Sequence, residues 1–186
     1  MWWSRSGILS YNRILNMVLS NRGGGKTFDA TKWVIDDFKK NKNMAMWVRR
    51  YGTELRGDDK NPGILDNDAF FKGVISEGLY KDTKLEIKGN MGYIDGEPAI
   101  YFVALSTSRS LKSMNFPDVN KIIFDEFVID SGRVTYLKNE VEVFLDLYET
   151  VARTRDNVRA LLLANSISIV NPYFLFWNIK PDKKKR

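Results

Sequence analysis

An α/β fold, with a mainly parallel β-sheet and helices on both of its faces, is predicted by two features of the sequence. Short apolar runs typical of buried strands alternate with segments whose apolar residues recur at helical spacing. Glycine-rich or polar segments with turn signals separate several of these runs. Strands that alternate with helices are typical of a parallel sheet covered on both sides. The 186 residues fit one domain, which at this size buries roughly 70% of its unfolded surface.

The first expected elements flank three consecutive glycines. Residues 13–20, RILNMVLS, are predicted to form a buried strand that ends at the glycines, and residues 26–41 an amphipathic helix. Turn signals at KGN and DGEP predict a small antiparallel meander at 85–105. The remaining expectations are strands at 44–50, 119–127 and 158–166, a long helix at 139–155, a loop at 51–68, and an aromatic segment packed on the core at 171–179.

The composition excludes several kinds of chemistry. The chain has no cysteine and no histidine, which excludes disulfides, thiolate nucleophiles, zinc fingers and Ser-His-Asp catalysis. Carboxylates, lysine, arginine, hydroxyls, backbone amides and a hard metal such as Mg²⁺ remain. These are the groups that phosphoryl transfer uses.

Charge and hydropathy give weaker information. The net charge is +6, but residues 180–186, KPDKKKR, carry +4 of it, so the charge alone does not indicate a nucleic-acid-binding face. A solvated tail is the alternative. No apolar run approaches the length of a transmembrane helix, and the first ten residues have too short an apolar core for a signal peptide. A cytoplasmic location and no membrane partner are therefore expected.

The stretch LSNRGGGKTF, residues 19–28, predicts a phosphate-binding loop of the Walker A type. Glycines allow positive φ, so that successive backbone N–H groups can converge on a phosphate, and the helix that follows adds its positive end. Lys26 is expected to reach the β- and γ-phosphates and Thr27 to ligate Mg²⁺. Ser20 replaces the usual first glycine, and an arginine lies inside the loop. The predicted nucleotide-binding residues are Ser20, Asn21, Arg22, Gly23, Gly24, Gly25, Lys26 and Thr27.

The stretch KIIFDEF predicts the partner motif, Walker B. Asp125, at the strand end, is expected to hold Mg²⁺, and Glu126 to polarise an attacking water. A guanine-reading NKxD motif is absent, and small kinases need no water-activating glutamate. The acid pair therefore points to ATP hydrolysis and to P-loop NTPases of the additional-strand, catalytic-glutamate class. The strand that ends in LLLANS is a candidate for the additional strand.

Further polar residues extend the predicted site. Asn165 or Ser166 would sense the γ-phosphate at the end of a strand, although a simple strand-end cap explains them equally well. A charge-stabilising arginine can come from a neighbouring subunit, and TVARTRDNVR offers Arg153, Arg155 and Arg159. These arginines also fit a structural alternative, as partners of the helix dipole.

With these motifs placed, the chain resembles the DNA-packaging ATPases of phi-29-like podoviruses, distant relatives of the large terminases. The resemblance runs from about residue 10 to residue 182 through SYNRILNMVLSNRGGGKT, WVRRYGTEL, FPDVNKIIFDEF, NEVEVFLDLYETVARTRDNVR and LLLANSISIVNPYFLFWNIKPD. It implies a motor that uses ATP and Mg²⁺ to pump double-stranded DNA into an empty capsid. Such motors assemble as a homo-oligomeric, pentameric ring on the portal vertex, in the host cytoplasm, in some relatives with a packaging RNA.

The resemblance also implies residue roles. Lys26 and Thr27 would bind phosphates and Mg²⁺, Asp125 would hold Mg²⁺ and Glu126 would activate water. Arg153 matches the trans-acting arginine finger.

Further matches are Lys112, a second basic position that faces the neighbouring site, and Asn165, the coupling position. Gly52 stands where relatives carry lysine, so no role is carried to it. Relatives continue into a linker and a nuclease-like domain; we expect residues 1–180 to form the ATPase domain and 181–186 a basic tail or the start of that linker.

Two other functions fit the same motifs. A non-hydrolysing, nucleotide-gated DNA clamp or scaffold would release no phosphate above a Lys26→Ala control. A small-molecule P-loop kinase would keep phosphoryl transfer in a Glu126→Gln variant. Arg22 is expected to sense the γ-phosphate or to reach across the ring interface.

Overall fold

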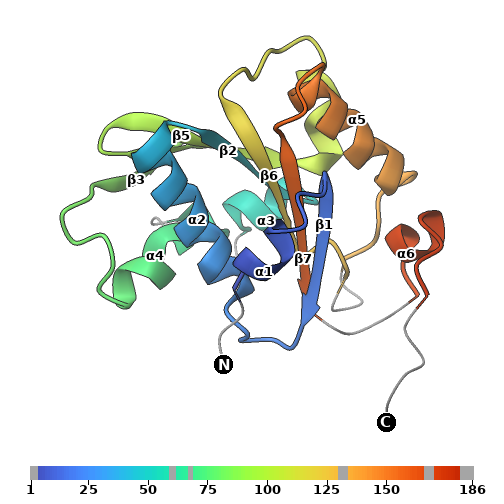
Figure 1. Ribbon diagram of the computed structural model, residues 1–186, viewed down its shortest axis with the longest axis horizontal. Coiled ribbons are helices and arrows are strands. Elements are labelled where there is room, and N and C mark those ends of the chain that lie inside the picture. Colours follow the sequence, from blue (N-terminus) through green and yellow to red (C-terminus); the bar gives the residue numbers. More distant parts are fainter. Residues whose placement is uncertain (1–3, 59–61, 67–68, 130–133, 166–169, 181–186) are drawn as a thin grey trace.

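The computed structural model contains a seven-stranded sheet with the strand order β1-β7-β6-β2-β5-β4-β3 (Figure 1). It describes residues 4–58, 62–66, 69–129, 134–165 and 170–180, so Ser166 and the predicted tail lie outside the described residues. The strands are β1 (Leu15–Ser20), β2 (Met44–Arg49), β3 (Leu85–Lys88), β4 (Met91–Ile94), β5 (Glu97–Ala104), β6 (Val119–Asp125) and β7 (Arg159–Asn165). The helices are α1 (Ser6–Leu9), α2 (Lys26–Asn41), α3 (Gly52–Arg56), α4 (Ala69–Ser76), the 3₁₀ helix η2 (Leu105–Leu111), α5 (Glu140–Ala152) and α6 (Pro172–Phe176).

The predicted mainly parallel sheet is confirmed. Strands β1, β7, β6, β2 and β5 pair in parallel, and β5, β4 and β3 pair antiparallel. Strand β7 lies between β1 and β6, so the strand that ends in LLLAN is the additional strand between the two phosphate-site motifs. The meander at 85–105 is also present, but its last strand has a second role that turn signals could not reveal, because β5 also pairs with β2.

Most expected elements form, with some differences. The helix predicted at 26–41 has those bounds. The strand predicted at 13–20 is shorter and only partly buried, because β1 is an edge strand of the sheet. The loop prediction for 51–68 is wrong in part, since α3 lies within it. Helix α4 was not expected.

The long helix α5 ends earlier than predicted. It stops at Ala152, and Arg153 adopts a positive φ of 50°. The guanidinium of Arg155 donates to the carbonyl oxygens of Val151, Phe116 and Pro117. These contacts turn the chain toward β7. The apolar spacing of the sequence did not indicate that the helix ends before residue 155.

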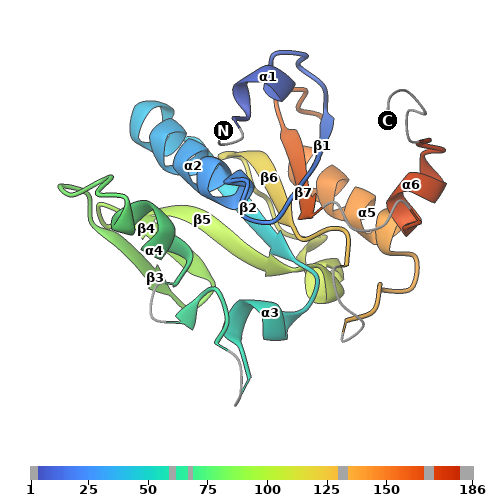
Figure 2. The ribbon, with the colours of Figure 1, turned by 90° about the horizontal axis from the view of Figure 1, so that it is seen from below.

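The two faces of the sheet have different covers (Figure 2). Helices α2 and α4 lie on one face, and α5, α6 and η2 lie on the other. Because successive strand residues point to opposite faces, each central strand is buried on both sides. Trp47 of β2 packs on Phe70 of α4, whereas Phe124 of β6 packs on Phe144 of α5 and Tyr173 of α6. The aromatic segment at 171–179 thus packs on the core through Tyr173, as expected.

Within the described residues, no helix is both long and apolar enough to span a membrane.

Candidate active site

A pocket of about 230 Å³ opens at the carboxyl edge of the parallel strands, where β1, β7 and β6 end. Parallel α/β sheets bind ligands at this edge. All residues that line this pocket except Ala164 belong to the predicted site. The lining residues are Arg22, Gly23, Gly24, Gly25, Lys26, Thr27, Asp125, Glu126, Ala164 and Asn165.

The glycine loop has the backbone that the sequence predicts. Gly23 and Gly25 have φ values of 78° and 81°, in the left-handed region that glycine adopts without strain. Gly25 is also the residue that precedes helix α2, so the positive end of this helix faces the pocket. At Gly24 an added Cβ would lie 2.9 Å from the Oγ of Ser20. The loop is therefore tightly packed at its centre, and a side chain at Gly24 would push on the residue that replaces the usual first glycine.

Ser20 and Asn21 lie behind the pocket and hold the lysine. The Nζ of Lys26 donates to the Oγ and the carbonyl oxygen of Ser20 at 2.9 and 3.2 Å, and to the carbonyl oxygen of Asn21 at 3.1 Å. A fourth bond, of 3.3 Å, goes to the Oδ1 of Asn165. Burial lowers the pKa of Lys26, and the attraction of Asp125 opposes this shift. The ammonium is thus held by neutral oxygens, which a phosphate can replace as partners.

Thr27 and Asp125 meet as the sequence predicts. The Oγ1 of Thr27 donates to the Oδ1 of Asp125 at 3.3 Å, which places a hydroxyl and a carboxylate oxygen side by side. Oxygen donors of this kind fit Mg²⁺, which commonly takes one or two protein ligands and keeps waters and phosphates as the others. The described residues hold no cluster of three acids that could bind a metal without such help.

Asp125 is buried, and this burial raises its pKa, although the nearby Arg49 opposes the shift. Uncompensated negative charge is costly in such a place. A divalent cation at this carboxylate would remove that cost, which further supports the fit of Mg²⁺.

Glu126 follows the strand with a strained backbone and an ion pair. Its φ is 64°, a left-handed conformation that costs a non-glycine residue on the order of 1–3 kcal/mol and that is frequent at functional sites. Its Oε2 lies 2.7 Å from the Nη1 of Arg49, and the Nη2 of Arg49 lies 3.2 Å from the Oδ2 of Asp125. One guanidinium therefore holds both acids of the predicted pair.

Arg50, the next residue, faces the other side of the sheet and is almost fully buried. Its Nε and Nη2 donate to the carboxylate of Glu140 at 2.7 and 2.9 Å, and Nη1 and Nη2 donate to the carbonyl oxygens of Glu126 and Phe127 at 3.3 and 2.8 Å. Glu140 also accepts from the hydroxyl of Tyr173. This buried network fixes the backbone around Glu126 to the first turn of α5.

Two predicted residues, Lys112 and Arg153, lie away from the pocket. Lys112 donates to the Oδ2 of Asp146 of α5 at 2.8 Å, and both side chains are about half exposed. Arg153 donates to the carbonyl oxygen of Met114 at 2.8 Å. Since α5 ends at Ala152 and β7 begins at Arg159, Arg153 lies toward the amino ends of the strands, opposite the glycine loop.

Arg49 and Arg50 were missed as functional residues. Two arginines at a strand end look like a solvated charge in the sequence. The available signal was their position, since Arg49 ends β2 and Arg50 follows it, beside the strand that carries Asp125. Their partners, however, lie 76 to 90 residues away along the chain.

Comparisons with known proteins identify the family of this chain. The model of the family "Podovirus DNA encapsidation protein (Gp16)" matches residues 1–186. The DNA packaging proteins of Bacillus phages PZA and phi29 are each 39% identical over 186 residues, which is all of this chain and 53% of the relative. That of Bacillus phage B103 is 38% identical over 179 residues, 96% of this chain and 52% of the relative. The chain thus spans about half the length of the curated relatives that it matches.

Solved structures show the same similarity. The crystal structure of the N-terminal domain of the DNA packaging ATPase from bacteriophage phi29 matches with a TM-score of 0.84 and 38% identity, over 100% of this chain and 90% of that chain. The large terminase ATPase domain of Thermus phage P74-26 matches with a TM-score of 0.60 over 100% of this chain and 72% of that chain; at 11% identity it supports the fold alone. The chain folds as a P-loop NTPase and belongs to the podovirus DNA encapsidation protein (Gp16) family.

Proposed function

We propose that this chain is an ATP-hydrolysing motor domain that drives double-stranded viral DNA into a procapsid. The observation that carries the proposal is the convergence of Lys26, Thr27, Asp125 and Glu126 on one pocket behind a positive-φ glycine loop. Such a pocket provides both a phosphate cradle and a carboxylate for the nucleophile. Membership of the DNA encapsidation family and the similarity to packaging ATPases support the coupling of this chemistry to DNA.

The roles follow from the contacts. The backbone amides of residues 23–27 bind the phosphates, and Lys26 exchanges its bonds to Ser20 and Asn21 for oxygens of the β- and γ-phosphates. Thr27 and Asp125 hold Mg²⁺, which when bound offsets the charge of the phosphates. Glu126 accepts a proton from the water that attacks the γ-phosphate, a type of step that contributes about 10²–10⁴-fold in rate.

Three further residues contribute to this site. Arg49 occupies the Oε2 of Glu126, so Glu126 acts as a base only after this ion pair loosens. Asn165, on the adjacent strand, accepts a hydrogen bond from the Nζ of Lys26. It is the residue that senses the γ-phosphate. Arg22, an exposed residue of the loop that lines the pocket, contacts the nucleotide.

Groups from a second copy complete the site. Arg153 and Lys112 lie away from their own pocket, and we assign them to the pocket of a neighbouring subunit in a pentameric ring. A solved phi29 packaging motor assembly, 39% identical over 97% of this chain, supports an assembled state. The ring sits at the portal vertex of the procapsid in the host cytoplasm, where packaging RNA is a further candidate partner.

The test is phosphate release by the protein with MgATP, with and without double-stranded DNA. The wild-type protein is expected to release phosphate, and DNA is expected to stimulate release. Lys26→Ala should lose nucleotide binding, whereas Glu126→Gln should keep binding and lose hydrolysis.

Each alternative predicts another pattern. Release no faster than the Lys26→Ala background would leave a nucleotide-gated clamp or scaffold. Continued phosphoryl transfer to an acceptor by Glu126→Gln would instead identify a kinase.

A further inference from the structure

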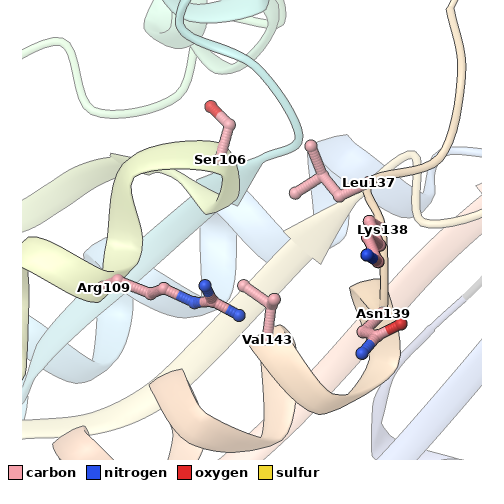
Figure 3. Close-up of a pocket in the computed structure, with 6 residues that line it drawn as sticks. All are labelled: Ser106, Arg109, Leu137, Lys138, Asn139 and Val143. Carbon is pink, nitrogen blue, oxygen red and sulfur yellow. The ribbon is translucent and has the colours of Figure 1, made fainter.

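A second cavity lies outside the nucleotide pocket, on the face covered by α5. Its volume is about 440 Å³, and it lies between η2 and the residues that lead into α5. Figure 3 shows Arg109 on one side and Lys138 and Asn139 on the other, with the guanidinium of Arg109 directed across the hollow toward α5.

The two cations of this cavity have no ion-pair partner in the described part of the chain, although Arg109, after Lys112, helps to lower the pKa of Asp146. Asp146 is hydrogen-bonded by Lys112, and Glu140 is buried against Arg50. Glu142, the other acid of the first turn of α5, is exposed and does not line the cavity. Positive charge from two separate segments therefore remains available at one concave place.

The backbone adds to this charge. Asn139 precedes α5 with a φ of 55°, and its side chain makes no capping bond. The 13-residue helix thus presents the positive end of its dipole toward the cavity. This helix end alone would define no site, but here it lies between two cationic side chains of a built cavity.

The lining also indicates which part of a ligand fits. The six described lining residues include no aromatic side chain on which a base could stack. Arginine, lysine and a helix end are instead the groups that contact phosphate oxygens. The cavity therefore suits a phosphodiester backbone better than a free nucleotide.

We infer that this cavity binds backbone phosphate of double-stranded DNA, through Arg109 and Lys138. The inference rests on the proposed function, since it identifies where the DNA of that motor touches the chain. It assigns contacts without sequence preference, because phosphate carries no base information.

The cavity is also joined to the catalytic site. The amide of Ser106 donates to the carbonyl oxygen of Arg50 at 3.0 Å, and the amide of Leu137 donates to the carboxylate of Glu140 at 2.8 Å. Both walls of the cavity are thus bonded to the Arg50–Glu140 pair, which also holds the carbonyl oxygen of Glu126. DNA bound here would act on the segment that carries the catalytic carboxylate.

The experiment compares Arg109→Gln/Lys138→Gln with Lys40→Gln/Lys72→Gln, which removes two exposed lysines from α2 and α4, on the opposite face. Affinity for a short duplex of mixed sequence is measured by fluorescence anisotropy over a range of salt concentrations. The Arg109→Gln/Lys138→Gln variant should bind several-fold more weakly. Its slope of log affinity against log salt should shrink by about 1 to 2, since each phosphate that the protein no longer neutralises reduces the slope by about 0.9. The control should keep the wild-type slope.

Basal ATP hydrolysis and the thermal unfolding midpoint separate this inference from the proposed function. Both should be unchanged in Arg109→Gln/Lys138→Gln, while stimulation of hydrolysis by DNA falls. Equal salt slopes for the two double variants, with DNA binding intact, would overturn the cavity assignment and leave the motor standing. A selective loss of ATP affinity would also overturn it, because the cavity would then serve the nucleotide. A wild-type protein that neither binds DNA nor hydrolyses ATP would remove the proposed function itself.

Discussion

The two sets of residues assigned to ATP chemistry differ in how the fold holds them. Lys26, Asp125 and Arg49 are buried at the carboxyl edge of the sheet, where Arg49 pairs with Asp125 and Lys26 is hydrogen-bonded to Ser20, Asn21 and Asn165. Lys112 and Arg153 lie along the η2–α5 side. Each forms an exposed hydrogen bond within its own chain, to Asp146 and to the carbonyl oxygen of Met114 respectively. The first set is pre-organised within one chain, whereas the second set is free to exchange its partners. This contrast is expected of a site that a neighbouring subunit completes.

The largest effect should come from the exposed set. Arg153→Ala is expected to lower ATP turnover by about 10³–10⁵-fold under conditions in which subunits assemble, because a trans arginine stabilises charge on the γ-phosphoryl group. ATP affinity and the unfolding midpoint should hardly change. Arg159→Ala is the matched control, since Arg159 contacts Asn12 of its own chain.

Mixed assemblies decide the direction of this contribution. Arg153→Ala subunits keep Glu126, and Glu126→Gln subunits keep Arg153, so a mixture should recover part of the turnover that each variant lacks alone. A mixture as inactive as its parts would mean that Arg153 acts within its own chain.

The next effect concerns stability in the buried set. Arg50→Met should lower the free energy of unfolding by about 3–5 kcal/mol, because Glu140 is left as a buried charge without its cation. Lys42→Met, which breaks the exposed pair with Glu97, should cost at most about 1 kcal/mol. Denaturant unfolding measures both. If Arg50→Met proved as mild as Lys42→Met, the Arg50 network would not be a stabilising feature of the fold.

A smaller effect depends on pH through Asp125. Burial raises its pKa above the ordinary value of 3.8, so the folded state binds this proton more tightly than the unfolded state. The contribution of Asp125 to the free energy of unfolding is therefore present at low pH, where its carboxyl group is protonated. This contribution is lost as pH rises through the raised pKa. Without Mg²⁺, the stability of the wild-type protein relative to Asp125→Asn should decrease from about pH 4 upward, as measured by thermal unfolding. A pH-independent difference would argue against a perturbed carboxyl group.

The smallest effect should come from the pair that holds Lys112. Asp146→Asn is expected to leave the free energy of unfolding almost unchanged, because both partners are about half exposed. The same variant should leave Lys112 more available to a neighbour. A large loss of stability on chemical unfolding would place this pair with the buried set instead.

Local patterns allowed much of this molecule to be predicted. Helix α2 and the glycine loop follow from neighbouring residues, because glycine conformation and helical spacing are local properties. The Asp125–Glu126 pair was likewise visible at the end of an apolar strand.

Two of the missed features depend on distant partners. The pairing of β5 with β2, and the burial of Arg50 by Glu140, join segments that no short window contains. Helix α4 was missed although its eight residues are mostly apolar, since so short a run fits a strand or a helix equally well.

The position of Arg50 has a mechanical consequence. Its guanidinium connects the end of β2, the two carbonyl groups after β6 and the first turn of α5, and Arg153 directly follows the last residue of α5. A shift of α5 would therefore be transmitted to the peptide of Glu126 through the hydrogen bonds of Arg50. In the proposed ring, Glu126 and Arg153 of one subunit would lie in two different ATP sites. The buried Arg50–Glu140 ion pair would then couple one hydrolysis step to the next.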